Sequence, residues 1–217
     1  MNRAAAPLHA ALPQTQCTRC GYPDCEGYAE AIAAGEAQIN QCPPGGAEGI
    51  RRLSVLTGRP VVPLNPDNGV EGPRTVAVID ENWCIGCTLC LDACPTDAIL
   101  GGNKRMHTVI EPYCTGCELC VPVCPVDCIA LENVTGGRTG WDAWSQPEAD
   151  LALARYEARK VRKKREEQDH AERMERKARE KLADLPALTH GAEGAELARK
   201  KAVIEAALAR ARAKRGA

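Results

Sequence analysis

The sequence contains no phenylalanine, and aromatic residues make up only 3% of its 217 residues. Large aliphatic residues are also scarce, because Val, Ile and Leu together number 39, about 18% of the chain. Leu, Ile, Val and Phe usually exceed about 20% in a protein with a well-filled core. We therefore expect no single large apolar core, and something other than hydrophobic burial must hold part of this protein together.

Long apolar runs are missing as well. No stretch approaches the roughly 18 apolar residues that a membrane span needs, and the longest runs, such as residues 76–79, are strand-sized. Residues 1–12 lack the basic start and continuous apolar segment of a signal peptide. We therefore expect a cytoplasmic protein, and disulfides are rare in that reducing compartment. Thirteen cysteines in such a protein indicate metal binding.

Charge is divided unevenly along the chain. Residues 1–140 carry 9 Lys/Arg against 15 Asp/Glu, a net −6, and residues 141–217 carry 19 against 14, a net +5. All 13 cysteines lie in the acidic part. The sequence therefore predicts two dissimilar parts joined end to end.

An internal repeat occupies the middle of the sequence. A shift of 30 residues lays Glu81–Cys90 on Glu111–Cys120, and it also lays Cys94–Pro95 on Cys124–Pro125. Two copies indicate a duplicated small unit rather than a solenoid. In each copy we expect a short strand before the cysteines (residues 75–80 and 107–111), a helical turn between the third and fourth cysteines, and another strand after the proline.

Each copy carries the spacing Cys-x2-Cys-x2-Cys-x3-Cys-Pro, which is the bacterial ferredoxin run for [4Fe–4S] clusters. Three thiolates on a tight loop can hold three corners of one cluster, and the fourth cysteine of the same copy ligates the other cluster. Structural zinc instead prefers pairs of close ligands separated by a longer connection. The spacing predicts two crossed ligand sets: Cys84, Cys87, Cys90 and Cys124 for one cluster, and Cys114, Cys117, Cys120 and Cys94 for the other.

Several neighbours of these cysteines are predicted to form the cluster environment. Gly86 and Gly116 lie inside the loops, where a side chain would crowd the cluster and backbone N–H groups can point at sulfur. We expect rigid turns at the prolines and aromatic packing over the clusters from the residue before each first cysteine. These four residues are Pro95, Pro125, Trp83 and Tyr113.

The thirteenth cysteine, Cys128, takes the place of Ala98 in the repeat alignment. We expect a small residue buried against a cluster, a role that free cysteine fills well. A ligand or redox-sensor role is a second interpretation, because the other twelve thiols already complete three sets of four.

A second group of cysteines precedes the repeat. The pattern Cys17-x2-Cys20-x4-Cys25-x16-Cys42-Pro43 supplies four soft thiolates, which can hold either zinc or an iron–sulfur cluster. The spacing alone leaves both open. Helices are expected over residues 26–39 and 47–56, and the proline-rich residues 59–74 are expected to form a linker.

The sequence past residue 140 is rich in helix formers of mixed charge. We expect one helix over Pro147–Leu185, ended by Pro186, and a second over Glu193–Arg215. Only ten Val, Ile or Leu occur in these 77 residues, which predicts an exposed helical tail. The run Arg155–Arg165 has seven basic residues against one acidic and is interpreted as a solvated face able to contact an anionic surface.

These patterns predict an α+β fold with a small helical domain around the first four cysteines, a pseudo-twofold 2[4Fe–4S] ferredoxin-like domain and a long charged helical tail, for which partial disorder is an open alternative. The expected boundaries are residues 1–10 for a flexible N-terminus, 11–58 for the four-cysteine domain, 59–74 for the linker, 75–135 for the ferredoxin domain and 136–217 for the tail.

The segment Leu12–Cys25 (LPQTQCTRCGYPDC), together with residues 28–32 and 40–46, resembles the RnfB family of the Rnf (Rsx) electron transport complex. The paired ferredoxin repeat fits that family as well. The usual members of the family begin with a hydrophobic helix that anchors them in the membrane. We expect no segment of this sequence to serve as such an anchor. The resemblance implies a third [4Fe–4S] cluster, held by Cys17, Cys20, Cys25 and Cys42.

We therefore expect an iron–sulfur protein that carries electrons through three [4Fe–4S] clusters and is not an enzyme by itself. Its expected partners are redox protein donors and acceptors, and the resemblance implies other Rnf subunits at the cytoplasmic face of the inner membrane. The acidic core should dock a basic patch. Neither a small-molecule substrate nor nucleic acid is expected. The alternatives are a freestanding soluble ferredoxin and a zinc-stapled module that binds nucleic acid or protein.

Overall fold

The computed structural model describes residues 3–185 and 194–215. The chain divides into two compact units, Met1–Arg159 and Lys160–Ala217. The first unit contains a helical part and a strand-rich part, and the second is helical. This mixed α+β fold confirms the fold class expected from the sequence.

The N-terminal part is built from three helices: α1 (Ala5–Ala10), α2 (Cys25–Ala34) and α3 (Gly46–Thr57). The Asp24 side chain accepts a hydrogen bond of 2.7 Å from the Gly27 N–H and so caps the start of α2. A small core fills the space between the helices and the loops that join them, and its largest members are Tyr28, Leu12, Ile32, Ile39 and Leu53.

Residues 1–10 are more ordered than the flexible terminus expected from the sequence. Ala5–Ala10 form α1, and Ala5 and Leu8 are buried in the same core as α2. The alanine-rich composition of this segment carries no periodic apolar pattern, so its packing has no clear signal in the sequence.

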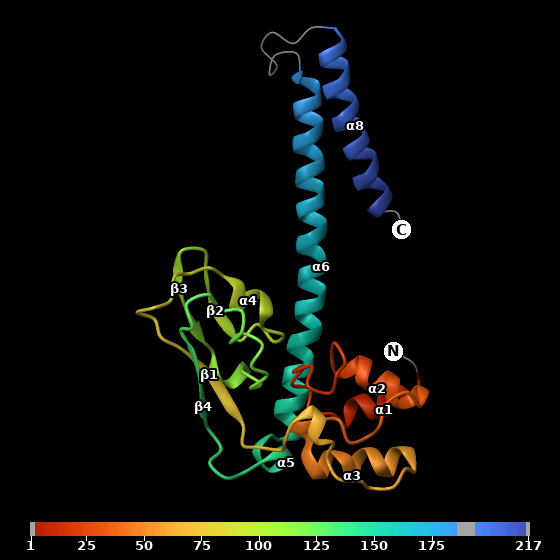
Figure 1. Ribbon diagram of the computed structural model, residues 1–217, viewed down its shortest axis with the longest axis vertical. Coiled ribbons are helices and arrows are strands. Elements are labelled where there is room, and N and C mark those ends of the chain that lie inside the picture. Colours follow the sequence, from red (N-terminus) through yellow and green to blue (C-terminus); the bar gives the residue numbers. More distant parts are fainter. Residues whose placement is uncertain (1–2, 186–193, 216–217) are drawn as a thin grey trace. The chain divides into compact units, whose positions relative to one another are not determined.

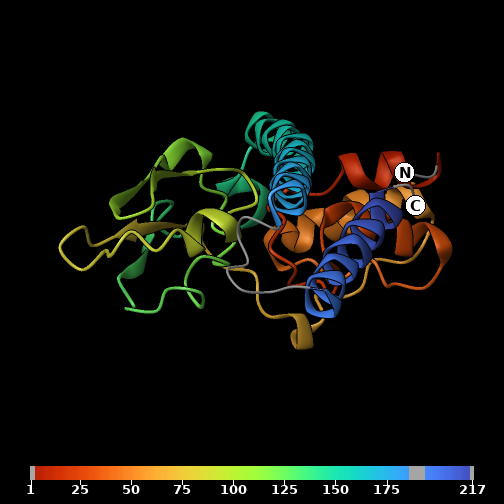
Figure 2. The same cartoon turned by 90° about the horizontal axis from the view of Figure 1, so that it is seen from above.

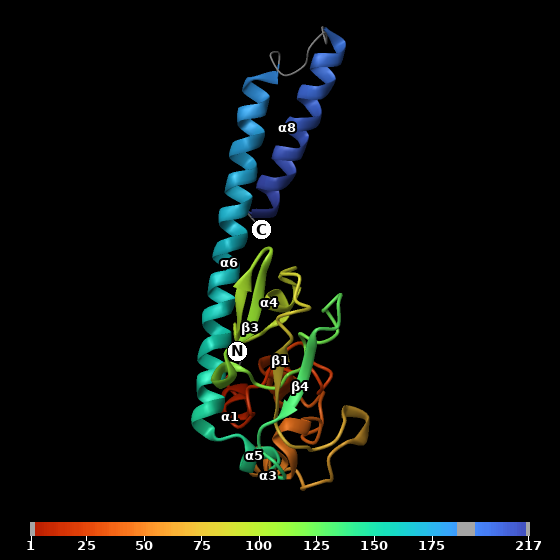
Figure 3. The ribbon, with the colours of Figure 1, turned by 90° about the vertical axis from the view of Figure 1, so that its left-hand side faces the viewer.

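Two antiparallel strand pairs form the strand-rich part of the first unit. Strand β1 (Thr75–Ile79) pairs with β4 (Ile129–Asn133), so that the repeat begins and ends in one ribbon. Strand β2 (Ile99–Gly102) pairs with β3 (Arg105–Val109) in a hairpin between the two copies. Both ribbons are visible in Figure 3. A short helix, α4 (Leu89–Ala93), carries the third cysteine of the first copy, Cys90, and ends just before the fourth, Cys94.

The two copies of the repeat share unusual backbone angles. Gly86 and Gly116 have φ of +66° and +67°, and Thr88 and Glu118 have φ of +69° and +66°. Left-handed φ is rare for a residue with a Cβ. Equal angles at matched positions therefore show that both cysteine loops adopt the same tight conformation.

The beginning of the tail packs on the rest of the first unit. Helix α5 (Gly140–Ala143) leads into α6 (Gln146–Ala183), and Trp144, Ala149 and Ala152 are buried together. The first turns of α6 lie between the N-terminal helices and the strands (Figures 1 and 2). The tail was expected to be an exposed helix, but a tryptophan and two alanines are buried at its beginning, and a count of Val, Ile and Leu overlooks them.

Two of the basic residues expected on a solvated face also belong to this packing. The guanidinium of Arg155 lies 3.7 Å from the ring centroid of Tyr113 and donates to the carbonyl oxygens of Thr96 and Asp97. Arg159 forms an ion pair with Asp97 at 3.4 Å. Their long side chains cover the strand-rich part while satisfying its backbone carbonyls.

The second unit consists of the rest of α6 and α8 (Ala195–Arg215), which run side by side (Figures 1 and 3). Glu175 links them because it pairs with Arg179 on α6 and with Arg212 on α8. The expected helix ends at Pro186 and Glu193 lie outside the described residues. Among the helices of residues 3–185 and 194–215, none has the length and apolar character that a membrane span requires.

Candidate iron–sulfur centres

The eight cysteines of the repeat line two separate cavities. One cavity is lined by the thiols of Cys84, Cys87, Cys90 and Cys124, and we call it cavity A. The other is lined by Cys94, Cys114, Cys117 and Cys120, and we call it cavity B. Of the cysteines at matched positions, each cavity thus receives three from one copy of the repeat and the fourth from the other copy, which is the crossed arrangement expected from the spacing.

Backbone N–H groups point at the fourth cysteine of each copy. The Ala98 N–H donates to the Cys94 sulfur at 3.2 Å, and the Cys128 N–H donates to the Cys124 sulfur at 3.4 Å. The residues that donate are at matched places in the repeat. Such donors favour a negatively charged sulfur, so the backbone is arranged to stabilise bound thiolates.

Burial raises the pKa of several thiols that line the cavities. It raises the pKa of Cys90 to about 11 and the pKa of both Cys117 and Cys120 to about 12, and the negative charges of neighbouring cysteines add to this effect. Iron binds the thiolate form, so loading each cavity must release protons and bring positive charge to the sulfurs. Four soft sulfur donors around one cavity are the ligand set of an iron–sulfur cluster.

The loop glycines lie against neighbouring backbone. A Cβ at Gly86 would come closer than 3.0 Å to backbone atoms of Lys104 and Arg105, and a Cβ at Gly116 would meet the Thr75 carbonyl oxygen. The nearest protein atoms are therefore a neighbouring loop or strand, so these glycines let each cysteine loop pack tightly against the rest of the domain.

The prolines and aromatic residues of the two copies are not equivalent. Pro95 is buried, but Pro125 is exposed. Tyr113 is partly buried under Arg155, whereas Trp83 is 67% exposed. The expected packing of Trp83 over a cluster is therefore not seen, and the two copies differ because Arg155 covers the aromatic residue of the second copy.

Cys128 also lines cavity A. Its sulfur lies 3.4 Å from the Cys124 sulfur, and burial together with the charge of Cys124 raises the pKa of Cys128 to about 12. Burial alone would raise the pKa of Cys124 too, but backbone N–H groups of Val126 and Cys128 outweigh it and lower that pKa. Cys124 is thus the better thiolate of the two, and Cys128 can donate its S–H to it.

The four N-terminal cysteines gather at the edge of the helical core. Cys17, Cys20 and Cys25 are buried and Cys42 is partly buried. Burial raises the pKa of Cys25 and Cys42, and for Cys42 the charges of Cys25, Cys17 and Cys20 add to the increase. Cys42 packs against the same core in which Cys20 and Cys25 are buried. Four sulfurs with no imidazole or carboxylate among them fit an iron–sulfur cluster.

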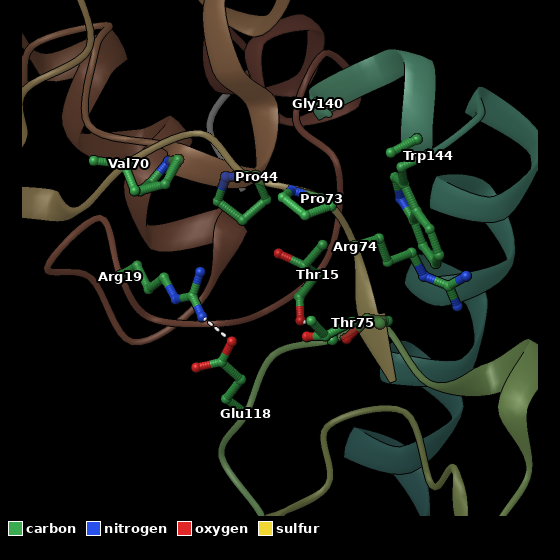
Figure 4. A pocket seen from close by; sticks show the side chains of 15 residues that line it. Thr15, Arg19, Pro44, Val70, Pro73, Arg74, Thr75, Glu118, Gly140 and Trp144 are labelled. Atoms are coloured by element: carbon green, nitrogen blue, oxygen red, sulfur yellow. Dashed lines mark hydrogen bonds and ion pairs between the residues drawn. The ribbon is translucent and has the colours of Figure 1, made fainter. Parts of the chain in front are cut away.

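The loop that carries Cys17 lies against the loop that carries Cys114 and Cys117. Thr115 donates its hydroxyl to the Thr15 carbonyl oxygen at 3.0 Å, and Arg19 forms an ion pair with Glu118 at 2.5 Å. Figure 4 shows this ion pair at the wall of a pocket that both loops line. The N-terminal cysteines are therefore next to cavity B.

Arg19 lies close to both cysteine groups. Burial by itself would lower its pKa, but the hydrogen bond and charge of Glu118 raise it, and the charges of Cys17 and Cys117 add to the rise. A single guanidinium is therefore within electrostatic reach of thiols from both groups.

Sequence reasoning missed several residues of these centres. His107, one of four histidines that form no pattern in the sequence, is 1% exposed and its Nδ1 lies 3.3 Å from the Cys90 sulfur. Thr96 lies 3.9 Å from the Cys94 sulfur, and Gln16 accepts the Cys25 N–H. None of these contacts follows a repeat spacing, so no signal in the sequence alone could have identified them.

Comparison with known proteins supports this description. The family described as "4Fe-4S dicluster domain" matches residues 77–131, and the family described as "Putative Fe-S cluster" matches residues 12–44. The B subunit of the ion-translocating oxidoreductase complex of Azoarcus sp. (strain BH72) is 60% identical over 147 residues, which are 68% of this chain and 80% of the relative.

The chain belongs to the RnfB family, the B subunits of ion-translocating oxidoreductase complexes. The corresponding proteins of Alkalilimnicola ehrlichii and Hahella chejuensis agree with this. They are 54% and 57% identical over 153 and 141 residues, covering 70% and 65% of this chain and 81% and 71% of the relatives. The resemblance to the Rnf complex is thereby confirmed, and this RnfB protein is an iron–sulfur electron carrier.

Proposed function

We propose that this RnfB protein holds three [4Fe–4S] clusters and passes single electrons between them. The ligands are Cys84, Cys87, Cys90 and Cys124 in cavity A; Cys94, Cys114, Cys117 and Cys120 in cavity B; and Cys17, Cys20, Cys25 and Cys42 in the N-terminal part. The observation that carries the proposal is the crossed lining of cavities A and B by cysteines of both copies.

The protein's own role is to hold, shield and space the clusters. Burial shields the thiols, and backbone N–H groups donate to the Cys94 and Cys124 sulfurs of cavities B and A. The clusters supply the one-electron chemistry when bound. This function requires no side chain that performs substrate chemistry.

We infer the order of the three centres from the contacts between the loops. The N-terminal set adjoins cavity B through the contacts of Thr115 and Arg19. Cavity B adjoins cavity A, since Cys90 of cavity A is buried in the same core cluster as Cys94 and Cys120 of cavity B. Electrons therefore pass along the line N-terminal set, cavity B, cavity A, in one direction or the other.

The assembly in which this carrier works is inferred from its relatives. Their names describe subunits of ion-translocating oxidoreductase complexes. We infer that this chain joins such a complex as a peripheral component and exchanges electrons with its other subunits. Work as a freestanding ferredoxin is the second possibility, and co-purification with membranes that contain the other subunits distinguishes the two.

Paired cysteine substitutions test the ligand sets. Cys94→Ala and Cys117→Ala should each remove the cavity B cluster, so the double variant should lose no more iron than either single variant. Cys94→Ala with Cys87→Ala should lose two clusters, because these residues serve different cavities. Iron content per chain is the measurement. The reverse pattern, with two clusters lost from the Cys94/Cys117 variant and one from the Cys94/Cys87 variant, would refute the crossed assignment.

A further inference from the structure

His107 is a buried polar residue that the electron-carrier function does not yet explain. It lies on β3, is 1% exposed, and holds its imidazole between two groups. Nδ1 is 3.3 Å from the Cys90 sulfur, and Nε2 is 3.3 Å from the Gly102 carbonyl oxygen. A buried imidazole needs partners for both ring nitrogens, and here one partner is a cysteine of cavity A.

The same residue touches a second cysteine of that cavity. The His107 backbone N–H donates to the Cys84 sulfur at 3.4 Å. His107 itself also lines cavity A. One residue of the β2–β3 hairpin thus contacts two of the four thiols through two different groups.

The hairpin makes room for the imidazole. A Cβ at Gly101 would overlap the His107 ring at Cδ2 and Cγ. The pairing of β2 with β3 is irregular between Leu100 and Gly102, just where the ring lies. Only a glycine at position 101 leaves the ring its place beside Cys90.

The second centre of the repeat has no equivalent of this contact. Cavity B is lined by no histidine in the described part of the chain. A shift of 30 residues puts Gly137 in the place of His107. The imidazole therefore distinguishes the cavity A set from the cavity B set, and so does the Cys128 thiol beside Cys124, whose matched residue at cavity B is Ala98.

A thiolate of a loaded centre has no proton, so a hydrogen bond between His107 and Cys90 must have Nδ1–H as its donor. The Gly102 carbonyl competes for the ring proton, but a negatively charged sulfur is the stronger acceptor. Addition of an electron increases the negative charge on the cluster and its sulfurs. A donor to sulfur therefore stabilises the reduced form more than the oxidised form.

We propose that His107, through its hydrogen bond to Cys90, sets the reduction potential of the cavity A cluster above that of the cavity B cluster. This inference rests on the proposed ligand sets. Electrons shared by the two clusters then reside on the cavity A cluster, the end of the line farthest from the N-terminal set. His107 acts as a positioning and tuning residue and is not a ligand.

Redox titration of the full chain, followed by electron paramagnetic resonance, tests the proposal. His107→Leu removes the donor and should lower the reduction potential of the cavity A cluster by about 59 mV. For a one-electron couple, this shift is a tenfold fall in the ratio of reduced to oxidised cluster at a given potential. His107→Gln keeps an N–H donor and should restore part of the shift. Thr108→Val, on the exposed side of the same strand, should leave all three potentials unchanged.

The outcomes separate this inference from the function on which it rests. Unchanged potentials in a His107→Leu protein with full iron content, or an equal shift of all three clusters, would overturn the tuning role alone. Failure of both the Leu and the Gln variant to retain the cavity A cluster would also overturn it, since His107 would then serve assembly. A parent protein without iron would instead overturn the proposed clusters.

Discussion

Thiols that hold iron and thiols that only fill space can be told apart by single substitutions. Cys17→Ser should lower iron from about twelve to about eight atoms per chain, because each [4Fe–4S] cluster needs its four thiolates. The ferredoxin pair should remain, since Cys17 lines neither cavity A nor cavity B. Iron analysis after anaerobic purification is the measurement, and parental iron content would show that Cys17 is not a ligand.

Cys128→Ser is the matched control for that experiment. Cys128 lies beside Cys124 but has no place in a set of four, so its loss should leave the iron content at the parental value. Loss of about four irons from this variant would identify Cys128 as the ligand in place of Cys124.

Gly116 and Gly136 have similar φ angles but different neighbours, so substitutions at the two positions test the packing of the cysteine loops. Gly136 has φ of +62° and open space around the position of a Cβ, so Gly136→Ala should cost only the left-handed strain, about 1–2 kcal/mol. Gly116→Ala adds a clash with the Thr75 carbonyl and should cost more. Unfolding by denaturant measures both, and equal losses would show that the loop does not press on β1.

At the scale of the elements, the first turns of α6 belong to the electron-carrying unit. Trp144 donates its Nε1–H to the Pro13 carbonyl oxygen at 2.8 Å, and Tyr156 donates its hydroxyl to Asp24 at 2.8 Å. These contacts join the start of the tail to the part that holds the N-terminal cysteines.

Two truncations follow from these contacts. A chain that ends after Arg159 should keep its iron and its unfolding midpoint, because the first compact unit ends there. A chain that ends at Gly140 should unfold more readily, since the loss of a buried tryptophan alone costs about 3–5 kcal/mol. Thermal unfolding of both proteins checks this, and equal stability would contradict the packing of α6.

The parts of this fold that depend on local spacing could be predicted from the sequence. Helices were expected near α2 and α3, and the ferredoxin spacing anticipated which cysteines would meet in cavities A and B. Cysteine spacing carries this information because the cluster geometry limits which loops can hold it. The domain boundaries expected from the sequence remain predictions.

Contacts between residues distant in the sequence could not be predicted in the same way. His107 reaches Cys90 across a hairpin, and Arg155 reaches Thr96 from a helix 59 residues away. The buried side of the first turns of α6 is formed by alanines, and alanine does not produce the apolar pattern by which a buried helix face is recognised in a sequence. Each of these features depends on how the elements pack, which periodicity does not specify.

At the scale of the whole carrier, the order of the centres is testable by magnetic interaction. Two reduced clusters split each other's resonance when they are close, and this effect falls steeply with distance. Cys94→Ala removes the middle cluster and should abolish the splitting between those that remain. Cys17→Ser removes an end cluster and should preserve it. Preserved splitting in Cys94→Ala would place the N-terminal set beside cavity A.

The central claim is that twelve of the 13 cysteines hold three iron–sulfur clusters. Its most direct test is iron and sulfide analysis of the anaerobically purified chain, with electron paramagnetic resonance after reduction by dithionite. We predict about twelve irons and twelve sulfides per chain, and the paramagnetic signals of reduced [4Fe–4S] clusters. A colourless protein that contains zinc and gives no signal on reduction would contradict the account.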